Sequence, residues 1–357
     1  MTTDIHLLKF KTTDPVDDTQ KRIMELFNKT GLANKIEKDD MTSVKVHFGE
    51  HGNTTYLPAH YVKPLVSVIK SKKAKPFVTD TNVLYKSRRD NAVDHLTLAN
   101  EHGFSLETLG APILIADGIV GHNDIPVQIN APNNKEVYLA TEFITSNSIV
   151  VATHATGHLV TGLGATIKNL GMGMASRKGK LIQHSVSKPT ISPQKCEACG
   201  LCIKWCPTDA ISINANHAEI NNEKCIGCGE CLAICRKDAV KFNWDANSKF
   251  LQEQIVEHAL GIVKQKKGKI AYFSFLVNMT KDCDCLKQPK KFVLPDIGVL
   301  AGNDPVAIDQ AIIDLTEKDG KNLADLSYPT IDPTPQLEYG EKIGLGSRKY
   351  NLIHVDF

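Results

Sequence analysis

Two runs of cysteine are the residues of this chain whose spacing most directly implies chemistry. Eight of the ten cysteines lie between residues 196 and 235. Each run has the spacing Cys-x2-Cys-x2-Cys-x3-Cys, and the members are Cys196, Cys199, Cys202, Cys206, Cys225, Cys228, Cys231 and Cys235. Thiolates at this spacing hold neighbouring irons of one cubane cluster from a single tight loop. Zinc sites also use paired cysteines, but two consecutive runs of four favour iron–sulfur clusters and hence one-electron transfer.

The ligands of the two clusters are expected to cross between the runs. In bacterial dicluster ferredoxins, the fourth cysteine of each run binds the cluster of the other run. One [4Fe–4S] cluster would then be bound by Cys196, Cys199, Cys202 and Cys235. The second [4Fe–4S] cluster would be bound by Cys225, Cys228, Cys231 and Cys206. Linked clusters conduct an electron between two points, so we expect a redox partner protein or a small-molecule substrate.

Composition excludes several other classes of partner. Lys and Arg together number 42 and Asp and Glu 40, so no basic excess points to nucleic acid. No stretch approaches about 18 consecutive apolar residues, so we expect no membrane span. Met1–Lys11 has neither a long apolar run nor a signal-type cleavage site. Because cysteines at metal-ligand spacing favour a reducing compartment, we expect a cytoplasmic protein.

Strand and helix patterns alternate along the first half of the chain. Short apolar runs predict strands at Ile5–Phe10, Val44–Phe48, Pro76–Asp80, Pro112–Ala116 and Ser148–Thr153. Helices are predicted at Asp17–Gly31, with Asp17 as the cap, and at His60–Lys70 and Asn91–Gly103. Ile125–Leu139 is typical of a hairpin. This alternation predicts an α/β fold with a mixed, mostly parallel sheet and helices on both faces.

The cysteine runs interrupt this pattern, which then returns. The later elements are a helix at Phe250–Gln265, strands at Ile270–Val277, Val299–Leu300 and Tyr350–Val355, and a helix at Asp304–Glu317 capped by Asp304. We therefore interpret residues 1–188 plus 243–357 as one discontinuous α/β domain. A small α+β dicluster ferredoxin-like domain would be inserted at residues 189–242. Three separate domains in series are the alternative.

His47 is the first candidate site residue outside the runs. It lies at the end of the predicted strand Val44–Phe48, before a loop that contains Gly49, Gly52 and Asn53. Ligands of open α/β sheets bind at the carboxyl ends of strands. The alternative is a buried histidine that only satisfies the core.

A second group of candidates follows the strand Ser148–Thr153. His154 and His158 are four residues apart and would share a face of a helical turn. A glycine-rich stretch comes next, and within it Lys168 could bind an anion or a carbonyl group. The basic run 176–180 is interpreted as a solvated loop, with binding of an anion or an acidic partner as the alternative.

Cys283 and Cys285 form the last candidate site. In an extended chain their Cα atoms would be about 7 Å apart, which is at the limit for a disulfide. We therefore favour a third metal centre or cluster at this pair, which His47, His154 or His158 could complete. Two cysteines without a metal are the alternative.

Several stretches outside the cysteine runs carry a resemblance to one family. They are Val44–Asn53, Thr55–Pro58, Thr79–Asn82, Asn91–His95, Gly162–Gly173, Gly179–His184, Cys283–Cys285 and Asp304–Asp309. With the cysteine runs, they make most of the chain resemble the uncharacterised iron–sulfur centre proteins grouped as domain-of-unknown-function family 362. The resemblance implies an α/β domain with a dicluster ferredoxin insertion and an anaerobic redox role, and it implies no particular substrate.

Three functions agree with these observations. The first is an iron–sulfur oxidoreductase, whose ferredoxin module passes single electrons to or from a site near His47, His158, Lys168 and the Cys283–Cys285 segment. That site would hold a third metal centre or a small anionic substrate. The second is a pure electron carrier that docks onto partner enzymes. The third is a factor that handles metal or iron–sulfur clusters. A homodimer is compatible with each.

Overall fold

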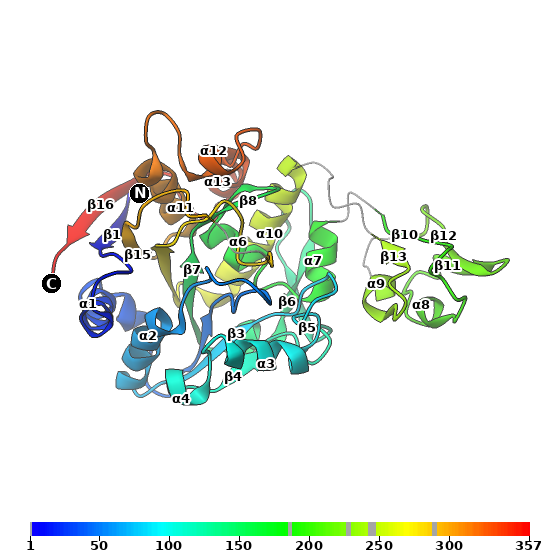
Figure 1. Ribbon diagram of the computed structural model, residues 1–357, viewed down its shortest axis with the longest axis horizontal. Helices are drawn as coiled ribbons and strands as arrows, with labels where there is room; N and C mark the ends of the chain where they lie inside the picture. The colour runs from blue at the N-terminus through cyan, green and yellow to red at the C-terminus, as the bar shows by residue number, and fades with distance from the viewer. Residues whose placement is uncertain (1, 185–187, 226–229, 242–247, 288–290) are drawn as a thin grey trace.

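The computed structural model of the chain describes residues 2–184, 188–225, 230–241, 248–287 and 291–357 (Figure 1). These residues contain an eight-stranded sheet with the spatial order β16 (Tyr350–Val355), β1 (Thr3–Lys9), β15 (Gly298–Gly302), β14 (Ile270–Leu276), β7 (Ser148–His154), β2 (Met41–Lys45), β3 (Lys75–Asp80) and β4 (Ile113–Ile115). Strand β15 is antiparallel to both of its neighbours, and the other adjacent pairs are parallel. The predicted α/β class with a mostly parallel sheet is confirmed.

Helices cover both faces of this sheet, as predicted. Ile149 and Val151 of β7 belong to one apolar core, whereas Val150 and Ala152 belong to the other. The first core is closed by α6 (Thr166–Gly171), α10 (Ser248–Lys266), α11 (Pro305–Thr316) and α13 (Thr334–Lys342). The second is closed by α1 (Val16–Lys29), α2 (Ala59–Ser71), α3 (Ala92–Glu101) and α4 (Leu106–Leu109). Successive side chains of a strand point to opposite faces, so both faces need cover.

Most predicted elements are present, with shifted ends. The strand expected at Val44–Phe48 is β2, which ends at Lys45. Asp304 caps α11 as expected, because its side chain accepts hydrogen bonds from the N–H groups of Val306 and Ala307. The prediction that Asp17 caps the first helix is wrong, since Pro15 takes the N-cap position of α1.

Two antiparallel hairpins flank the sheet. The predicted hairpin is formed by β5 (Asp124–Gln128) and β6 (Glu136–Ala140). The second consists of β8 (Thr156–His158) and β9 (Gly162–Gly164), which directly follow β7. His154 and His158 would share a helix face only if their turn were helical, and it is not, because these residues are in strands. Outside the cysteine-rich segment, the other described short helices are η1 (Leu32–Lys35), α5 (Thr141–Thr145), α7 (Arg177–Gln183) and α12 (Leu323–Ser327).

The cysteine-rich segment lies to one side of the sheet (Figure 1). Its elements are β10 (Thr190–Ile191), α8 (Leu201–Lys204), β11 (Ile211–Asn214), β12 (His217–Ile220), α9 (Glu230–Ile234) and β13 (Val240–Lys241). Strand β10 pairs with β13, so the chain enters and leaves the segment at adjacent positions. A small core built from Ile211, Ala218, Cys231 and Val240 lies inside the segment.

None of the described helices combines the length and the apolar composition that a membrane span needs.

Candidate functional site

The carboxyl ends of β7, β2 and β3 border a cavity of about 440 Å³. Ligands of open α/β sheets bind at this position. The cavity is lined by the six side chains that we proposed outside the cysteine runs, namely His47, His154, His158, Lys168, Cys283 and Cys285. The structure therefore brings these residues together, and their chemical roles stay predictions.

A buried ion pair in the cavity wall was missed from the sequence. Lys45 Nζ lies 3.0 Å from Asp80 Oδ1, and it donates a hydrogen bond of 2.7 Å to Asn169 Oδ1. Burial alone would raise the pKa of Asp80, but nearby cations, Lys45 first among them, hold it well below its usual value. The available signal was a charge within each of two apolar strand runs, Val44-Lys45-Val46 and Val78-Thr79-Asp80.

Arg89 forms a second buried charged group beside this pair. Its Nε lies 3.1 Å from Glu50 Oε2, and its Nη2 donates to the hydroxyl of Tyr85 at 2.5 Å. Arg89 is 1% exposed. Arg89 was also missed, because it lies in an irregular segment where a charged residue is ordinary.

His47 has a protein N–H group directed at each of its ring nitrogens. Gly49 N–H donates to its Nδ1 at 3.0 Å, and Arg89 Nη1 lies 2.9 Å from its Nε2. Burial, followed by the charge of Arg89, lowers the pKa of His47 well below its usual value. A neutral imidazole has one acceptor nitrogen, so only one of these two groups can donate to His47. The enclosed position of the ring favours the alternative interpretation of His47 as a buried histidine of the core.

Lys168 presents a cation to the cavity. Its ammonium makes no hydrogen bond or ion pair within the described part of the chain, although Asn169 beside it is bonded to Lys45 and Thr153. Burial lowers the pKa of Lys168 to about 8, and the charges of Lys45 and Arg89 add to this effect. A cation in this position suits an anionic ligand.

Helix α6 carries Lys168 and is anchored from the next layer. The carboxylate of Asp309 in α11 accepts 2.8 Å hydrogen bonds from the N–H groups of Thr166 and Ile167, the first residues of α6. Gly171 ends the helix against α10, where a Cβ atom would lie 1.9 Å from the carbonyl oxygen of Ile255. These contacts fix the direction in which Lys168 enters the cavity.

The basic run 176–180 is not a solvated loop. Ser176 caps α7, since its hydroxyl accepts a hydrogen bond from Gly179 N–H at 3.1 Å. Lys180 is buried, lines the cavity and donates 2.7 Å hydrogen bonds to Thr81 Oγ1 and to the carbonyl of Ala175. The run thus adds a cation to the cavity wall.

His154 lies between two protein acceptors, and its role as a metal ligand stays a prediction. Its Nδ1 lies 2.9 Å from Asp284 Oδ2, and its Nε2 lies 2.8 Å from the carbonyl oxygen of Val277. Both ring nitrogens are therefore directed at protein acceptors. The side chain ties the end of β7 to the segment that carries Cys283 and Cys285.

The segment that carries Cys283 and Cys285 is a turn, contrary to the extended chain expected. Leu286 N–H donates to the carbonyl of Cys283 at 3.2 Å, and Glu50 N–H donates to the carbonyl of Asp284 at 2.9 Å. The turn brings the two cysteine Cα atoms to 5.3 Å, and a disulfide joins the side chains. The expectation that their separation disfavours a disulfide is wrong.

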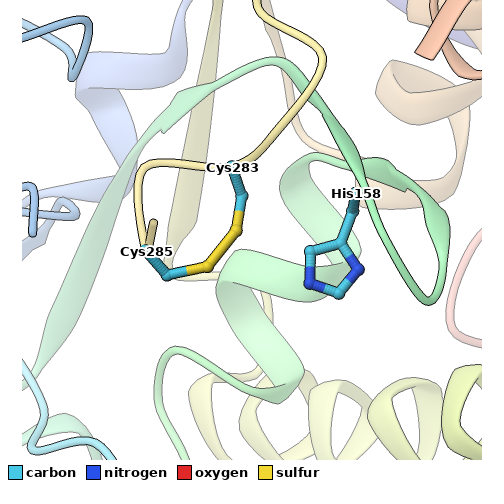
Figure 2. A group of neighbouring side chains, drawn as sticks. All are labelled: His158, Cys283 and Cys285. Carbon is cyan, nitrogen blue, oxygen red and sulfur yellow. A yellow bond between two sulfur atoms is a disulfide. The ribbon is translucent and has the colours of Figure 1, made fainter. Parts of the chain in front are cut away.

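His158 lies beside the two sulfur atoms (Figure 2). A nitrogen of its ring and the sulfurs of Cys283 and Cys285 all lie within 4.8 Å of one another. This spacing could hold a metal ion once the disulfide is reduced. The sequence-based prediction of a Cys/His site at this place therefore has the required proximity, without a bound metal to test it.

The cysteine-rich segment places N–H donors on its sulfur atoms. Ala210 N–H donates to Cys206 Sγ at 3.2 Å, and Ala239 N–H donates to Cys235 Sγ at 3.4 Å. Ala218 N–H lies 3.3 Å from Cys196 Sγ. In the first two contacts, the N–H donor lies four residues after the fourth cysteine of its run. Hydrogen bonds of this kind stabilise thiolates that bind iron.

The four cysteines of the first predicted ligand set lie near one another. Burial raises the pKa of the Cys202 thiol, and the nearby thiols of Cys196, Cys199 and Cys235 raise it further. These four are the residues expected to bind one cluster. Of the second set, Cys206, Cys225 and Cys231 are described, and Cys228 lies outside the described residues.

The cysteine-rich segment contacts the wall of the cavity. Leu232, next to Cys231, packs against Leu84 and Leu181, and Leu84 lines the cavity. The rings of Trp205 and His122 also meet, with centroids 5.4 Å apart. Residues adjacent to predicted cluster ligands therefore reach the α/β part of the chain.

The sequence between residues 43 and 314 matches the profile described as a domain of unknown function, DUF362. The chain belongs to the DUF362 family. The matched range runs from β2 into α11, so it includes the cysteine runs and every cavity residue named above. No curated protein matches the chain.

Two solved structures have a limited likeness to this DUF362 chain. One is the lactate racemase apoprotein from Thermoanaerobacterium thermosaccharolyticum, with 12% identity, a TM-score of 0.41, and coverage of 77% of this chain and 50% of the other. The second is a Thermotoga maritima protein, with 9% identity, a TM-score of 0.39, and coverage of 81% of this chain and 55% of the other. The chain thus spans about half the length of these structures.

Proposed function

We propose that this chain is an iron–sulfur redox protein with a dicluster module at residues 189–242, inserted into an α/β domain of residues 1–188 plus 243–357. The module would exchange single electrons with a small anionic substrate in the cavity. When bound, each [4Fe–4S] cluster would accept or release one electron at a time.

The hydrogen bonds to sulfur carry this proposal. In both runs, the N–H group four residues after the fourth cysteine donates to that sulfur, from Ala210 to Cys206 and from Ala239 to Cys235. A neutral thiol is a weak acceptor, whereas a metal-bound thiolate is stabilised by such donors. The repeated geometry therefore fits two equivalent clusters, one for each run.

A short route from the module to the cavity supports the same proposal. Leu232 follows Cys231, which is one of the predicted ligands, and packs against Leu84 in the cavity wall. Electrons at the second cluster would therefore start close to the cavity. A pure carrier needs only an exposed cluster and makes no use of this contact.

The charges in the cavity favour an anion as the substrate. Its described lining has four cationic side chains, Lys45, Arg89, Lys168 and Lys180, and two carboxylates, Asp80 and Asp284. Lys45 is paired with Asp80, and Arg89 is paired with Glu50. Lys168 has no such partner among the described residues and can attract a ligand. Near neutral pH it can also donate a proton to a substrate that receives an electron from the module.

Iron and sulfide analysis of anaerobically purified full-length protein tests the clusters. We expect about eight irons and eight sulfides per chain, with a brown absorbance that dithionite bleaches. A Cys199→Ser variant should lose about half of the iron, because only one cluster depends on that ligand. Stoichiometric zinc in place of iron would contradict the proposal.

Anion binding in the cavity distinguishes an enzyme from a pure electron carrier. The Lys168→Met variant should keep the iron content and the dithionite bleaching of the wild type, because Lys168 lies in α6 and is not a predicted cluster ligand. It should lose the binding of anions in the cavity. If electron transfer to partner proteins survives and no anion binds the wild type, the carrier function is favoured instead.

A further inference from the structure

The turn that carries Cys283 and Cys285 is built into the cavity wall. Asn53 Nδ2 donates hydrogen bonds to the carbonyls of Asp284 at 3.2 Å and Leu286 at 3.1 Å. The carboxylate of Asp284 is held by His154. Cys283 is 6% exposed, and both cysteines line the cavity. The pair is thus held close together whether or not its sulfurs are bonded to each other.

The hydrogen bonds of His158 decide which of its nitrogens carries a proton. Val160 N–H and Thr161 N–H both point at Nδ1, at 3.3 and 3.1 Å. The hydroxyl of Thr161 lies 2.9 Å from the same atom and can act as donor or acceptor, whereas the two backbone groups can only donate. Nδ1 therefore accepts, and a neutral imidazole must carry its proton on Nε2.

That proton faces the sulfur atoms. Figure 2 shows one ring nitrogen of His158 directed at the cysteine pair and the other directed away from it. The nitrogen directed away is Nδ1, because it is held by the turn between β8 and β9. Nε2–H thus faces Cys283 and Cys285, whose sulfurs lie within 4.8 Å of a nitrogen of this ring.

The same geometry disfavours a metal at this place. A histidine that binds a metal through Nε2 normally donates its Nδ1–H to a carboxylate or a carbonyl. Here the backbone of the β8–β9 turn offers two N–H groups to Nδ1 instead. A metal bound at Nε2 would put the imidazole proton on Nδ1, where it would face these two backbone N–H groups. A thiolate at the cysteine pair, in contrast, is an acceptor that suits the Nε2–H group.

We propose that Cys283 and Cys285 are a reversible dithiol–disulfide couple whose thiolate is stabilised by the Nε2–H group of His158. Reduction breaks the S–S bond and takes up two electrons and one proton. It leaves one thiol and one thiolate, and the thiolate accepts the hydrogen bond from His158. A dithiol can supply both electrons by exchange, being itself oxidised to a disulfide.

The couple extends the proposed function. It rests on that function only for the source of its electrons in the working protein, which would be the two clusters. A dithiol couple in the cavity would store the two electrons that a substrate needs, whereas clusters deliver electrons singly. His158 acts through the sulfurs and is a positioning residue. The chemistry of the pair can be measured with a simple dithiol.

Quantitative alkylation tests the couple. The full-length protein, purified without oxygen, is equilibrated in buffers of reduced and oxidised dithiothreitol and then quenched with iodoacetamide. Trypsin releases residues 282–287 as one peptide that contains both cysteines. We expect this peptide to change from no adducts to two adducts over a narrow range of the buffer ratio, and to change back on reoxidation.

His158 variants test the role of the imidazole. The His158→Leu variant should weaken the reduced form, so that the equilibrium constant for reduction falls about tenfold or more, as expected for one lost hydrogen bond to a charged group. The His158→Gln variant retains an N–H donor and should recover most of this loss. His354→Leu, an exposed change in β16, should match the wild type.

Three results would overturn the inference. The first is a pair that stays fully alkylated after oxidation. The second is a bound metal ion that is lost when Cys283 is changed to Ser and that protects the pair from alkylation. The third is a midpoint unchanged in His158→Leu. A protein without iron whose pair still titrates with dithiothreitol would refute the proposed function and leave the couple standing.

Discussion

At the residue scale, the chemistry of the cavity depends on which polar atoms the protein has already engaged. His47 and His154 have a protein group at each ring nitrogen, whereas His158 directs one nitrogen at the sulfurs of Cys283 and Cys285. Histidines that look alike in the sequence thus have different surroundings in the structure. The ammonium of Lys168 is the cation that the described protein atoms leave for a ligand.

Anion binding in the cavity should weaken as the pH rises through about 8. The pKa of Lys168 is lowered to about 8, so its charge is mostly present at pH 7 and mostly absent at pH 9. With inorganic phosphate as the probe, calorimetric titration should give an affinity for the phosphate dianion about tenfold lower at pH 9 than at pH 7.

Two variants check the assignment of this pH dependence to Lys168. Lys168→Met should bind phosphate weakly at both pH values. Lys287→Met, at an exposed position beside the site, should behave as the wild type. A wild-type affinity that does not change between pH 7 and pH 9 would contradict the assignment.

Removal of Lys45 should strongly destabilise the fold. Lys45 and Asp80 are buried and lie 3.0 Å apart, so Lys45→Met leaves a carboxylate in the core without its nearest cation. We expect the free energy of unfolding in urea to fall by about 3–5 kcal/mol. The double variant Lys45→Met/Asp80→Asn should lose less than the sum of the single changes.

A surface ion pair provides the control for this measurement. Lys29 and Glu25 lie on the exposed side of α1 with N and O atoms 3.5 Å apart. The Lys29→Met change should alter the unfolding free energy by less than about 1 kcal/mol. Equal effects of the two lysine changes would show that burial is not the cause.

At the element scale, the site depends on how α6 is packed. Asp309 of α11 holds the first turn of α6, and Gln183 of α7 donates to the carbonyl of Gly171 at its end, at 2.7 Å. Gly171 also lets α10 approach closely. The position of Lys168 is therefore a result of contacts with three other helices.

Gly171→Ala should loosen this arrangement. Its Cβ atom would lie 1.9 Å from the carbonyl oxygen of Ile255, so α6 and α10 would have to move apart. We expect a destabilisation of about 1–3 kcal/mol in urea denaturation, together with weaker phosphate binding. Thr97→Ala, on the exposed face of α3, should change neither property. Unchanged stability of Gly171→Ala would mean that the two helices are not in close contact.

At the scale of the whole molecule, the two large cores contain none of the described residues of the cysteine-rich segment. Both are built from residues before 189 and after 242. The segment has its own small core, and its first and last strands pair through Thr190 and Lys241. Its contacts with the sheet domain include those of Leu232 and Trp205.

Removal of the segment should therefore leave the sheet domain folded. We expect a chain in which a short Gly/Ser linker replaces residues 189–242 to unfold cooperatively, within a few degrees of the full-length protein, in circular dichroism. It should contain no iron. A deletion chain that fails to fold, while the full-length protein is stable, would show that the sheet domain depends on the module.

Much of the fold followed from local patterns in the sequence. Apolar runs of strand length alternating with helical patterns predicted the α/β class, and the Asp304-Pro305 start of α11 was visible because capping depends on adjacent residues. The Asp17 cap failed because several residues near a helix start can compete for one position.

The sequence by itself determined which residues are candidates for chemistry. A run such as Cys196–Cys206 is a local pattern, and its spacing limits the kinds of metal centre that it can bind. Only the tertiary structure decided how the residues of the cavity combine. His154 is more than a hundred residues from Asp284, and the turn at Cys283 is held by Asn53. Hydrogen bonds between such distant residues set which nitrogen or sulfur is available, and no local pattern contains that information.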